Sequence, residues 1–202
     1  IVQFPSELVQ AKFLGRRKRF FADVELMDGS QAVAHCPNPG SMRGNLEPGM
    51  PVFLQDTGAD HLARGRKLRY RWVLADTGKN LVCVDTSLAN HLVLQSLNAN
   101  LIPELRGYSE IIPEFTIEDS RLDFLLLGAG DKTPCFVEVK SVSMIESGIA
   151  FFPDSVTTRG QKHLLELMEL AQGGNRAVIL FVIQAREINE FGPADAIDLA
   201  HG

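Results

Sequence analysis

Two apolar segments and a helix-like segment between them constrain the fold more than any other feature of the chain. Residues 135–142, CFVEVKSV, and residues 176–184, RAVILFVIQ, both read as strands, and the second is continuously apolar, as in a strand buried on both faces. Residues 157–172 place apolar side chains at helical spacing and end at Gly173-Gly174. A helix that joins two strands favours a sheet with a parallel part and helices on its faces.

The segments before this unit extend it. Residues 87–98, SLANHLVLQSLN, predict a helix, and residues 109–118 and 121–127 predict two further strands. The expected order is therefore helix, three strands, helix and strand. This pattern indicates an α/β (α+β) fold with a mixed sheet flanked by helices.

The first third of the chain predicts strands separated by turns. Asp28-Gly29 lies between two β-rich runs and is typical of a hairpin turn. Residues 37–50 are dense in Pro, Gly and Asn and predict a loop, and residues 51–57 and 69–77 predict further strands. Short strands joined by long polar loops favour a small β-barrel of the OB type.

The charges are unevenly distributed along the chain, whose net charge is −5. Residues 1–75 hold eleven Lys and Arg against seven Asp and Glu, whereas residues 76–202 hold nine against eighteen. Such asymmetry is typical of a basic module joined to an acidic one. The basic module could contact a polyanion, but the excess by itself does not identify one.

The expected compartment follows from several features that the sequence lacks. No apolar run reaches the roughly 18 residues that cross a bilayer, and the first ten residues do not resemble a signal peptide. Cys36, Cys83 and Cys135 form no CxxC pair, so neither a zinc site nor a disulfide framework is indicated. We expect a cytoplasmic protein with reduced thiols and no membrane partner.

Two charges interrupt the apolar segment 135–142. Glu138 and Lys140 are two residues apart, so on a strand both side chains point to the same face. Asp123 lies in the preceding strand, and pairing of the two strands would bring the three side chains together. Two carboxylates suit Mg²⁺ or Mn²⁺, and the lysine offsets the remaining charge. Phosphodiester hydrolysis needs such a cation and a nearby basic group.

A polar cluster near the start of the helix over 157–172 supports this interpretation. Its members are Arg159, Gln161, Lys162 and His163. Basic side chains and backbone N–H groups at a helix start can hold a phosphate. Two alternatives remain open: Glu138 and Lys140 could form an ion pair on a solvated face, and the polar cluster could be a solvated first turn.

Basic residues in the first third are candidates for contact with a nucleic-acid backbone. They are Arg16, Arg17, Lys18, Arg19, Arg43, Arg66, Lys67, Arg69 and Arg71. Contacts of this kind have little sequence preference and weaken steeply with salt. Tyr70 and Trp72 alternate with these residues, and we expect them in the barrel core rather than stacked on bases.

Residues 35–44, HCPNPGSMRG, form a loop whose small residues permit close approach of the backbone to a ligand. His35, Asn38 and Ser41 are candidate ligand contacts in this loop. For His35, a role as a hydrogen-bonded residue at the end of a strand is equally consistent with the sequence. A histidine next to a cysteine does not by itself predict a metal site.

The order Asp123, then Glu138-x-Lys140, then a helix with a polar start resembles the PD-(D/E)xK nuclease superfamily. A longer series of segments resembles the sugar fermentation stimulation protein (SfsA) family more closely. The segments are KRFFADVEL, HCPNPGSM, RKLRYRWVL, TSLANHLV, LIPELRGY, SRLDFLL, FVEVKSV, FPDSVTTRGQKHLLELM and RAVILFVIQ. Because they follow one another over nearly the whole chain, this resemblance is far more specific than the ExK string.

The resemblance implies an OB-like domain, which we place over residues 1–78, and a nuclease-like domain over residues 79–202. It also implies association with DNA and a further acidic ligand. Helix 87–98 contains no Asp or Glu, so Glu104 and Glu110 are the nearest candidates for that ligand, and we favour Glu104 because it lies in LIPELRGY. Asp154, in FPDSVTTRG, is expected at the rim of the site as a further metal ligand or a helix cap.

Two departures from the family pattern bear on these expectations. Pro39 stands where the family loop has Thr, so any role of that hydroxyl is lost while the shape of the loop can survive. Family members also continue beyond IDLAHG, the end of this sequence. A final helix and strand are therefore expected to lie outside it.

The leading hypothesis is a DNA-binding protein with a Mg²⁺-dependent nuclease-like site built on Asp123, Glu138 and Lys140. Gln161 or Lys162 would steady the phosphate. One alternative is a non-catalytic, sequence-nonspecific DNA-binding or regulatory protein that affects sugar metabolism. A third possibility is a nuclease fold that acts on RNA or on a nucleotide. The sequence does not predict the oligomeric state.

Overall fold

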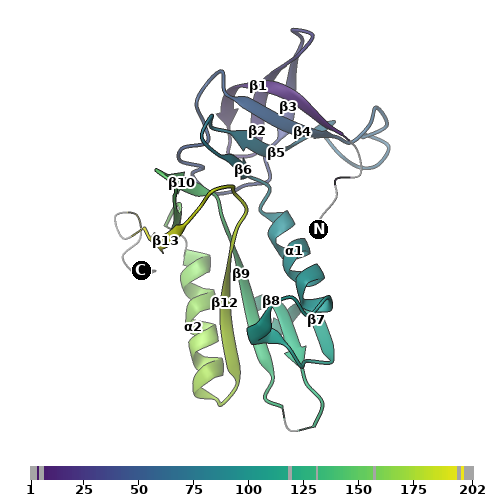
Figure 1. The fold of residues 1–202 in the computed structure, drawn as a ribbon. Coiled ribbons are helices and arrows are strands. Elements are labelled where there is room, and N and C mark those ends of the chain that lie inside the picture. The colour runs from purple at the N-terminus through teal and green to yellow at the C-terminus, as the bar shows by residue number, and fades with distance from the viewer. Residues whose placement is uncertain are drawn as a thin grey trace.

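The protein consists of a β-barrel and an α/β unit that lie end to end, with helix α1 leading from one to the other (Figure 1). The computed structural model describes residues 4, 7–117, 120–130, 132–156, 158–194 and 197, and it describes Arg159 in its backbone alone. The expected division into a β-rich first part and a mixed second part therefore corresponds to two spatial units.

The barrel is formed by a six-stranded sheet in the order β3-β2-β1-β4-β5-β6. The strands are β1 (Leu8–Arg17), β2 (Phe21–Leu26), β3 (Gln31–His35), β4 (Pro51–Asp56), β5 (Tyr70–Asp76) and β6 (Leu81–Cys83). A parallel pairing between β3 and β5 closes five of the strands into a barrel. The expected OB-like architecture is thereby confirmed.

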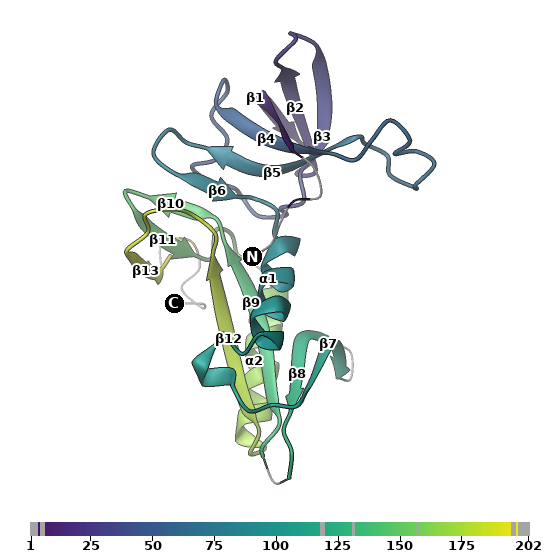
Figure 2. The same ribbon diagram turned by 45° about the vertical axis from the view of Figure 1, so that its right-hand side comes forward.

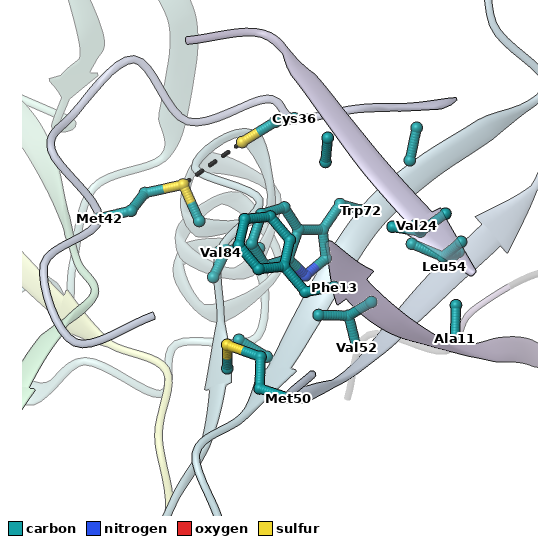
Figure 3. Close-up of a cluster of buried hydrophobic side chains, with 13 residues drawn as sticks. Ala11, Phe13, Val24, Cys36, Met42, Met50, Val52, Leu54, Trp72 and Val84 are labelled. Carbon is teal, nitrogen blue, oxygen red and sulfur yellow. Dashed lines mark hydrogen bonds between the residues drawn. The ribbon is translucent and has the colours of Figure 1, made fainter. Parts of the chain in front are cut away.

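Inward-facing side chains of alternate residues fill the barrel (Figure 3). Ala11 and Phe13 of β1 are buried, whereas the intervening Lys12 is exposed, which is the alternation of a strand with one solvated face. Trp72 is fully buried and stacks on Phe13, with ring centroids 5.1 Å apart. Trp72 is thus a core residue, as expected, and burying such a side chain contributes roughly 1.5–3 kcal/mol.

The hairpin predicted around Asp28-Gly29 is confirmed. Strands β2 and β3 pair antiparallel, and the N–H of Leu26 donates to the carbonyl of Ser30 at 2.8 Å to close the turn. Gly29 has a φ of +83°, a conformation that side chains disfavour. Strand β1 was not predicted, because its polar outer face and its terminal arginines hide the apolar alternation.

The second unit contains a four-stranded sheet in the order β12-β9-β8-β7, covered by one helix on each face. Its elements are α1 (Ser87–Asn98), the short 3₁₀ helix η1 (Pro103–Leu105), β7 (Glu110–Ile117), β8 (Ser120–Leu127), β9 (Cys135–Val142), α2 (Thr158–Gln172) and β12 (Arg176–Ile183). Strands β9 and β12 pair in parallel, whereas β7, β8 and β9 pair antiparallel. The predicted sheet with a parallel part is confirmed. Among the described helices, none is long and apolar enough to cross a membrane.

Three short strands that were not predicted form a small sheet beside the barrel end of β9 and β12 (Figures 1 and 2). They are β10 (Met144–Glu146), β11 (Ile149–Phe152) and β13 (Glu190–Pro193), in the order β10-β11-β13. Their shortness explains why the sequence did not reveal them, since three or four residues carry too little periodicity.

The barrel and the second unit are joined by backbone and side-chain hydrogen bonds. The N–H of Cys83 in β6 donates to the carbonyl of Gln184 at 2.9 Å, directly after β12. From the loop after β3, Asn45 Nδ2 donates to the carbonyl of Ser143 at 2.8 Å. Strand β6 lies beyond the boundary that we expected between residues 78 and 79, yet it pairs with β5 in the first sheet.

Candidate functional site

A cleft of about 580 Å³ lies where the barrel meets the second unit. Both units contribute to its walls. Among the lining residues are Asn38, Pro39 and Gly40 of the barrel loop, Asn90 and His91 of α1, Asp123, Glu138 and Lys140 of the sheet, and Asp154 and His163 near the start of α2. The three residues that carried the metal hypothesis therefore face one cavity.

Asp123 occupies the point at which strands β8 and β9 stop pairing. The ladder ends at Phe124 opposite Val137, immediately before Asp123. The Asp123 carboxylate then takes the place of a ladder partner, because Oδ2 accepts the N–H of Val139 at 2.7 Å. Oδ1 accepts Nδ2 of Asn90 at 2.6 Å, so a helix and a strand both fix this carboxylate.

The environment of Asp123 opposes its negative charge. Burial raises the pKa of the Asp123 carboxyl above its ordinary value, and the nearby negative charge of Glu138 raises it further. The hydrogen bonds from Val139 and Asn90 and the positive charge of Lys140 act in the opposite direction. A bound cation would relieve the first two effects at once.

Glu138 is buried, and its two oxygens have different surroundings. Oε1 accepts Nζ of Lys140 at 2.8 Å and Nδ1 of His163 at 2.5 Å. Oε2 is buried and has no hydrogen-bond partner among the described residues. Buried carboxylate oxygens without a partner are costly, so an oxygen left open beside Asp123 suits a ligand.

The donor set fits a hard divalent cation. Mg²⁺ is commonly held by one or two carboxylates, keeps several waters and takes further oxygens from a substrate phosphate. Asp123 and Glu138 provide two such carboxylates on one cavity wall. In the part of the chain that the structure describes, no three His, Cys, Asp or Glu side chains form a metal-binding group. The cleft therefore suits a cation that is completed by water and substrate rather than a closed structural site.

The third acidic ligand expected from the family pattern does not belong to this cleft. Glu104 lies in η1 and is exposed, and its charge acts on Arg176 at the far end of β12 rather than on Asp123. It is absent from the described lining of the cleft. The structure therefore does not bring Glu104 to the cleft, because η1 packs beside the opposite end of the sheet.

Among the members of the polar cluster near the start of α2 whose side chains the structure describes, one contributes to the cleft wall. His163 lines the cleft and bonds Glu138. Lys162 lies within 3.5 Å of Glu166 one turn further along, and neither it nor Gln161 is among the lining residues. The side chain of Arg159 lies outside the described residues. The side chains of one helical turn point in different directions around the axis, so those of Gln161, Lys162 and His163 cannot all face one cavity.

Asn90 was not singled out from the sequence, although its amide holds Asp123. The signal lay in helix 87–98, whose apolar face is interrupted by polar Asn90 and His91 on the side of the cleft. An asparagine that donates to a carboxylate leaves the negative charge available to a cation. A carboxylate at position 90 would instead have repelled Asp123.

The loop over residues 35–44 holds the two units together and also forms one wall of the cleft. Asn38 is buried, and its amide donates to Oγ of Ser143 and accepts the N–H of Gly40 at 2.8 Å. The N–H of Met42 donates to Oδ2 of Asp154 at 3.2 Å. A Cβ added at Gly40 would overlap the Asp154 carboxylate, so a larger residue here would force that side chain to move. Asp154 thus supports the loop rather than a cation.

The other residues that were assigned to this loop lie elsewhere. Ser41 is exposed and does not line the cleft, and its Oγ accepts the N–H of Arg43. His35 sits at the end of β3 and faces a different hollow of the barrel. Of the three candidate ligand contacts, only Asn38 reaches the cleft.

Several basic residues of the barrel bind the protein itself. Arg16 donates to the carbonyls of Asn38 at 2.5 Å and Gly40 at 2.9 Å, so it shapes the cleft wall rather than facing solvent. Arg71 is held by the buried carboxylate of Asp85 at 2.5 Å. We therefore reassign Arg16 and Arg71 from phosphate contact to support of the fold.

The remaining basic residues of the barrel are exposed. Arg17 pairs with Asp23 and Arg69 pairs with Asp56 on the surface. The other candidates for contact with a nucleic-acid backbone have no ion-pair partner among the described residues: Lys18, Arg19, Arg43, Arg66 and Lys67. Arg19 also lines the cleft. A polyanion could thus meet several uncompensated positive charges on the barrel.

Comparisons with known proteins agree with the fold and its division. Residues 14–84 match the family model of the SfsA N-terminal OB domain, and residues 87–202 match that of the sugar fermentation stimulation protein RE domain. A sugar fermentation stimulation protein homolog from Maricaulis maris is 44% identical over 199 residues, which cover 98% of this chain and 83% of the relative. The homolog from Geotalea daltonii is 45% identical over 196 residues, which cover 96% and 82%.

A solved structure is also similar over the whole chain. It is the structure of Pyrococcus furiosus SfsA in complex with Ca²⁺, with a TM-score of 0.85 and 28% sequence identity. The similarity covers 99% of this chain and 84% of the archaeal one. Both units and their connection are therefore shared with that protein.

Proposed function

Because this chain belongs to the sugar fermentation stimulation protein (SfsA) family, we propose that it binds DNA and that its cleft hydrolyses phosphodiester bonds with Mg²⁺ or Mn²⁺. The observation that carries this proposal is the pair of carboxylates at the end of the β8–β9 ladder. Glu138 keeps one buried oxygen that has no hydrogen-bond partner in the described part of the chain, and Asp123 lies beside it in a setting that disfavours its charge.

Asp123 and Glu138 would hold the cation. Such a cation supplies a Lewis acid that polarises a phosphate and lowers the pKa of a bound water. The similar protein from P. furiosus was solved in complex with Ca²⁺, which prefers the same hard oxygen ligands. This supports a divalent cation for the present chain.

The other side chains of the cleft have distinct roles in the proposal. Lys140 lies at 2.8 Å from Glu138, where its ammonium group can orient a water or hold a phosphate oxygen. His163 keeps the Glu138 carboxylate in one orientation through its N–H, as outer residues of metal sites commonly do. Asn90 does the same for Asp123.

The barrel would hold the DNA backbone next to the cleft. Arg19 lines the cleft, and Lys18 and Arg43 lie exposed on neighbouring loops without ion-pair partners among the described residues. Backbone contacts of this kind carry little sequence preference and release counterions, so binding should weaken steeply as salt rises. This is the pattern that we expect for the DNA complex.

A cleavage assay on dye-labelled DNA tests the proposal. Wild-type protein should cleave in Mg²⁺ or Mn²⁺. Glu138→Gln should lower the cleavage rate about a hundredfold or more, because removing a metal ligand reduces activity at least as much as removing a residue that hydrogen-bonds to a ligand. Glu104→Gln is the matched control, since Glu104 is an exposed acid outside the cleft. Calorimetric titration of Mn²⁺ should show binding to wild type and to Glu104→Gln but not to Glu138→Gln.

The outcomes separate the proposal from its alternative. DNA binding that is steep in salt, with intact DNA at every metal concentration, would identify a non-catalytic DNA-binding protein. Cleavage by Glu138→Gln at the wild-type rate would remove the catalytic role of the cleft. Cleavage of RNA in preference to DNA would change the substrate and leave the site assignment in place.

A further inference from the structure

A second hollow of about 360 Å³ lies on the wall of the barrel, outside the cleft. Three aromatic side chains contribute to its lining: Phe20, Phe21 and Tyr70. Phe20 immediately precedes β2, and Phe21 and Tyr70 begin β2 and β5, two strands that β3 brings together by pairing with both. The size of the hollow is at the lower end of the range for small-ligand sites, so it suits one small planar group.

One of these rings is unusually exposed. Phe20 has 45% of its surface in contact with solvent, although it lies beside the apolar rings of the hollow. Its backbone is fixed by a hydrogen bond, because the N–H of Cys36 donates to the Phe20 carbonyl at 2.9 Å. The Phe20 ring, however, does not pack in the barrel core. A large ring held in this way offers a face on which another flat group can stack.

The charges around the hollow favour an anionic ligand. Arg66 and Lys67 line it and have no ion-pair partner among the described residues, and none of the described lining residues is acidic. His35 also lines it, and burial followed by the positive charge of Arg71 lowers the pKa of its imidazole. A neutral imidazole can both donate to and accept from the edge of a base.

The hollow and the cleft are neighbours along the chain. Arg19 lines the cleft and the next residue, Phe20, lines the hollow. Arg71 lines the hollow, and its partner residue Ser87 lines the cleft. Because adjacent or hydrogen-bonded residues line the hollow and the cleft, we expect one nucleic-acid strand to reach both.

We propose that the hollow binds one unpaired nucleobase of a DNA strand whose neighbouring nucleotides run into the cleft. The base would stack on Phe20, and Arg66 and Lys67 would contact the adjoining phosphates. This inference rests on the proposed DNA binding and narrows its substrate to DNA with unpaired nucleotides, such as overhangs, frayed ends and single strands. Fully paired DNA presents no free base and uses the basic surface alone.

Fluorescence anisotropy in the presence of EDTA tests this proposal without any cleavage. The probes are a blunt duplex, the same duplex with a short unpaired overhang, and that overhang with abasic sugars in place of the bases. Wild-type protein should bind the overhang about tenfold more tightly than the blunt or abasic probe, which corresponds to about 1.4 kcal/mol, a typical value for stacking of one base.

Phe20→Ala should remove this preference and leave affinity for the blunt duplex unchanged, whereas Phe20→Tyr should keep the preference. Met27→Ala is the matched control, because Met27 is 71% exposed on the same barrel but lies outside the hollow. Equal binding of the base-containing and abasic overhangs by wild type would overturn the inference and leave the proposed DNA binding intact. If wild type bound none of the probes, both the inference and the proposed function would fail.

Discussion

Replacement of Arg71 by alanine separates two readings of the basic residues in RKLRYRW. In the sequence, Arg71 is one of several candidate phosphate contacts. In the structure, its guanidinium donates from Nε and NH2 to the Asp85 carboxylate at 2.5 and 2.7 Å and also reaches Ser87 Oγ at 2.8 Å. The Asp85 side chain is 3% exposed and that of Arg71 is 25% exposed. Arg71→Ala would leave this carboxylate buried without its cation.

The magnitude follows from this burial. Removal of one partner from a buried ion pair costs about 3–5 kcal/mol, because the remaining charge stays desolvated. Since the Arg71 side chain retains some contact with solvent, we take the lower end, about 3 kcal/mol. For a protein of this size, 1 kcal/mol shifts Tm by about 2–4 °C, so Arg71→Ala should lower Tm by about 6–12 °C.

Thermal unfolding followed by circular dichroism measures this shift. Arg69→Ala is the matched control, because Arg69 pairs with Asp56 on the surface, where water replaces the lost partner. The shift for Arg71→Ala should also depend less on salt than that of the control. The double replacement of Arg71 and Asp85 by alanine should recover part of the loss, because no buried charge remains. A Tm shift for Arg71→Ala no larger than that for Arg69→Ala would refute the reasoning.

Three further predictions concern Gly40 in the cleft wall, the Asp123 carboxyl group and the Cys83 thiol. Gly40→Ala should cost about 1–3 kcal/mol of unfolding free energy in urea titrations because its Cβ would overlap the Asp154 carboxylate, and adding Asp154→Ser should restore most of the loss. The pKa of Asp123 is higher in the folded protein than its value near 3.8 in the unfolded chain. Protonation of Asp123 therefore stabilises the folded state at pH values below 3.8, and this stabilisation is lost as the pH rises through the folded-state pKa. Asp123→Asn should therefore raise Tm at pH 7 without metal while abolishing cleavage; an unchanged or lower Tm would contradict this. Burial raises the pKa of the Cys83 thiol to about 12, so the native protein should resist thiol reagents that react rapidly after denaturation.

Most long elements were predicted correctly, with the exception of the ten-residue strand β1. Helices α1 and α2 and strands β8, β9 and β12 lie where the apolar spacing of the sequence indicated, to within a residue or two. Each of these elements carries its own pattern over eight or more residues. The short strands β6, β10, β11 and β13 were missed, because they form only where a neighbouring strand offers partners for their backbone groups.

The structure brings together the three central residues of the candidate site, whereas it places several of the surrounding candidates elsewhere. Asp123, Glu138 and Lys140 lie on adjacent strands, so alternation and pairing alone bring them close together. Glu104 was misplaced and Asn90 was overlooked, because both judgements depend on how a helix packs against the sheet. Arg16 was assigned to DNA contact because the sequence shows its charge but not the loop carbonyls to which it donates.

Local pattern by itself determined the helices and most of the longer strands, the order of a β-rich part and an α/β unit, and the placement of two acids and a lysine on adjacent strands. These follow from side-chain direction and apolar spacing, which act over a few residues. Tertiary structure alone decided which basic side chains form ion pairs, how the loop after β3 closes the cleft, and that Phe20 lies exposed beside a hollow. Such features arise from contacts between residues far apart in the chain, and neither propensity nor periodicity encodes them.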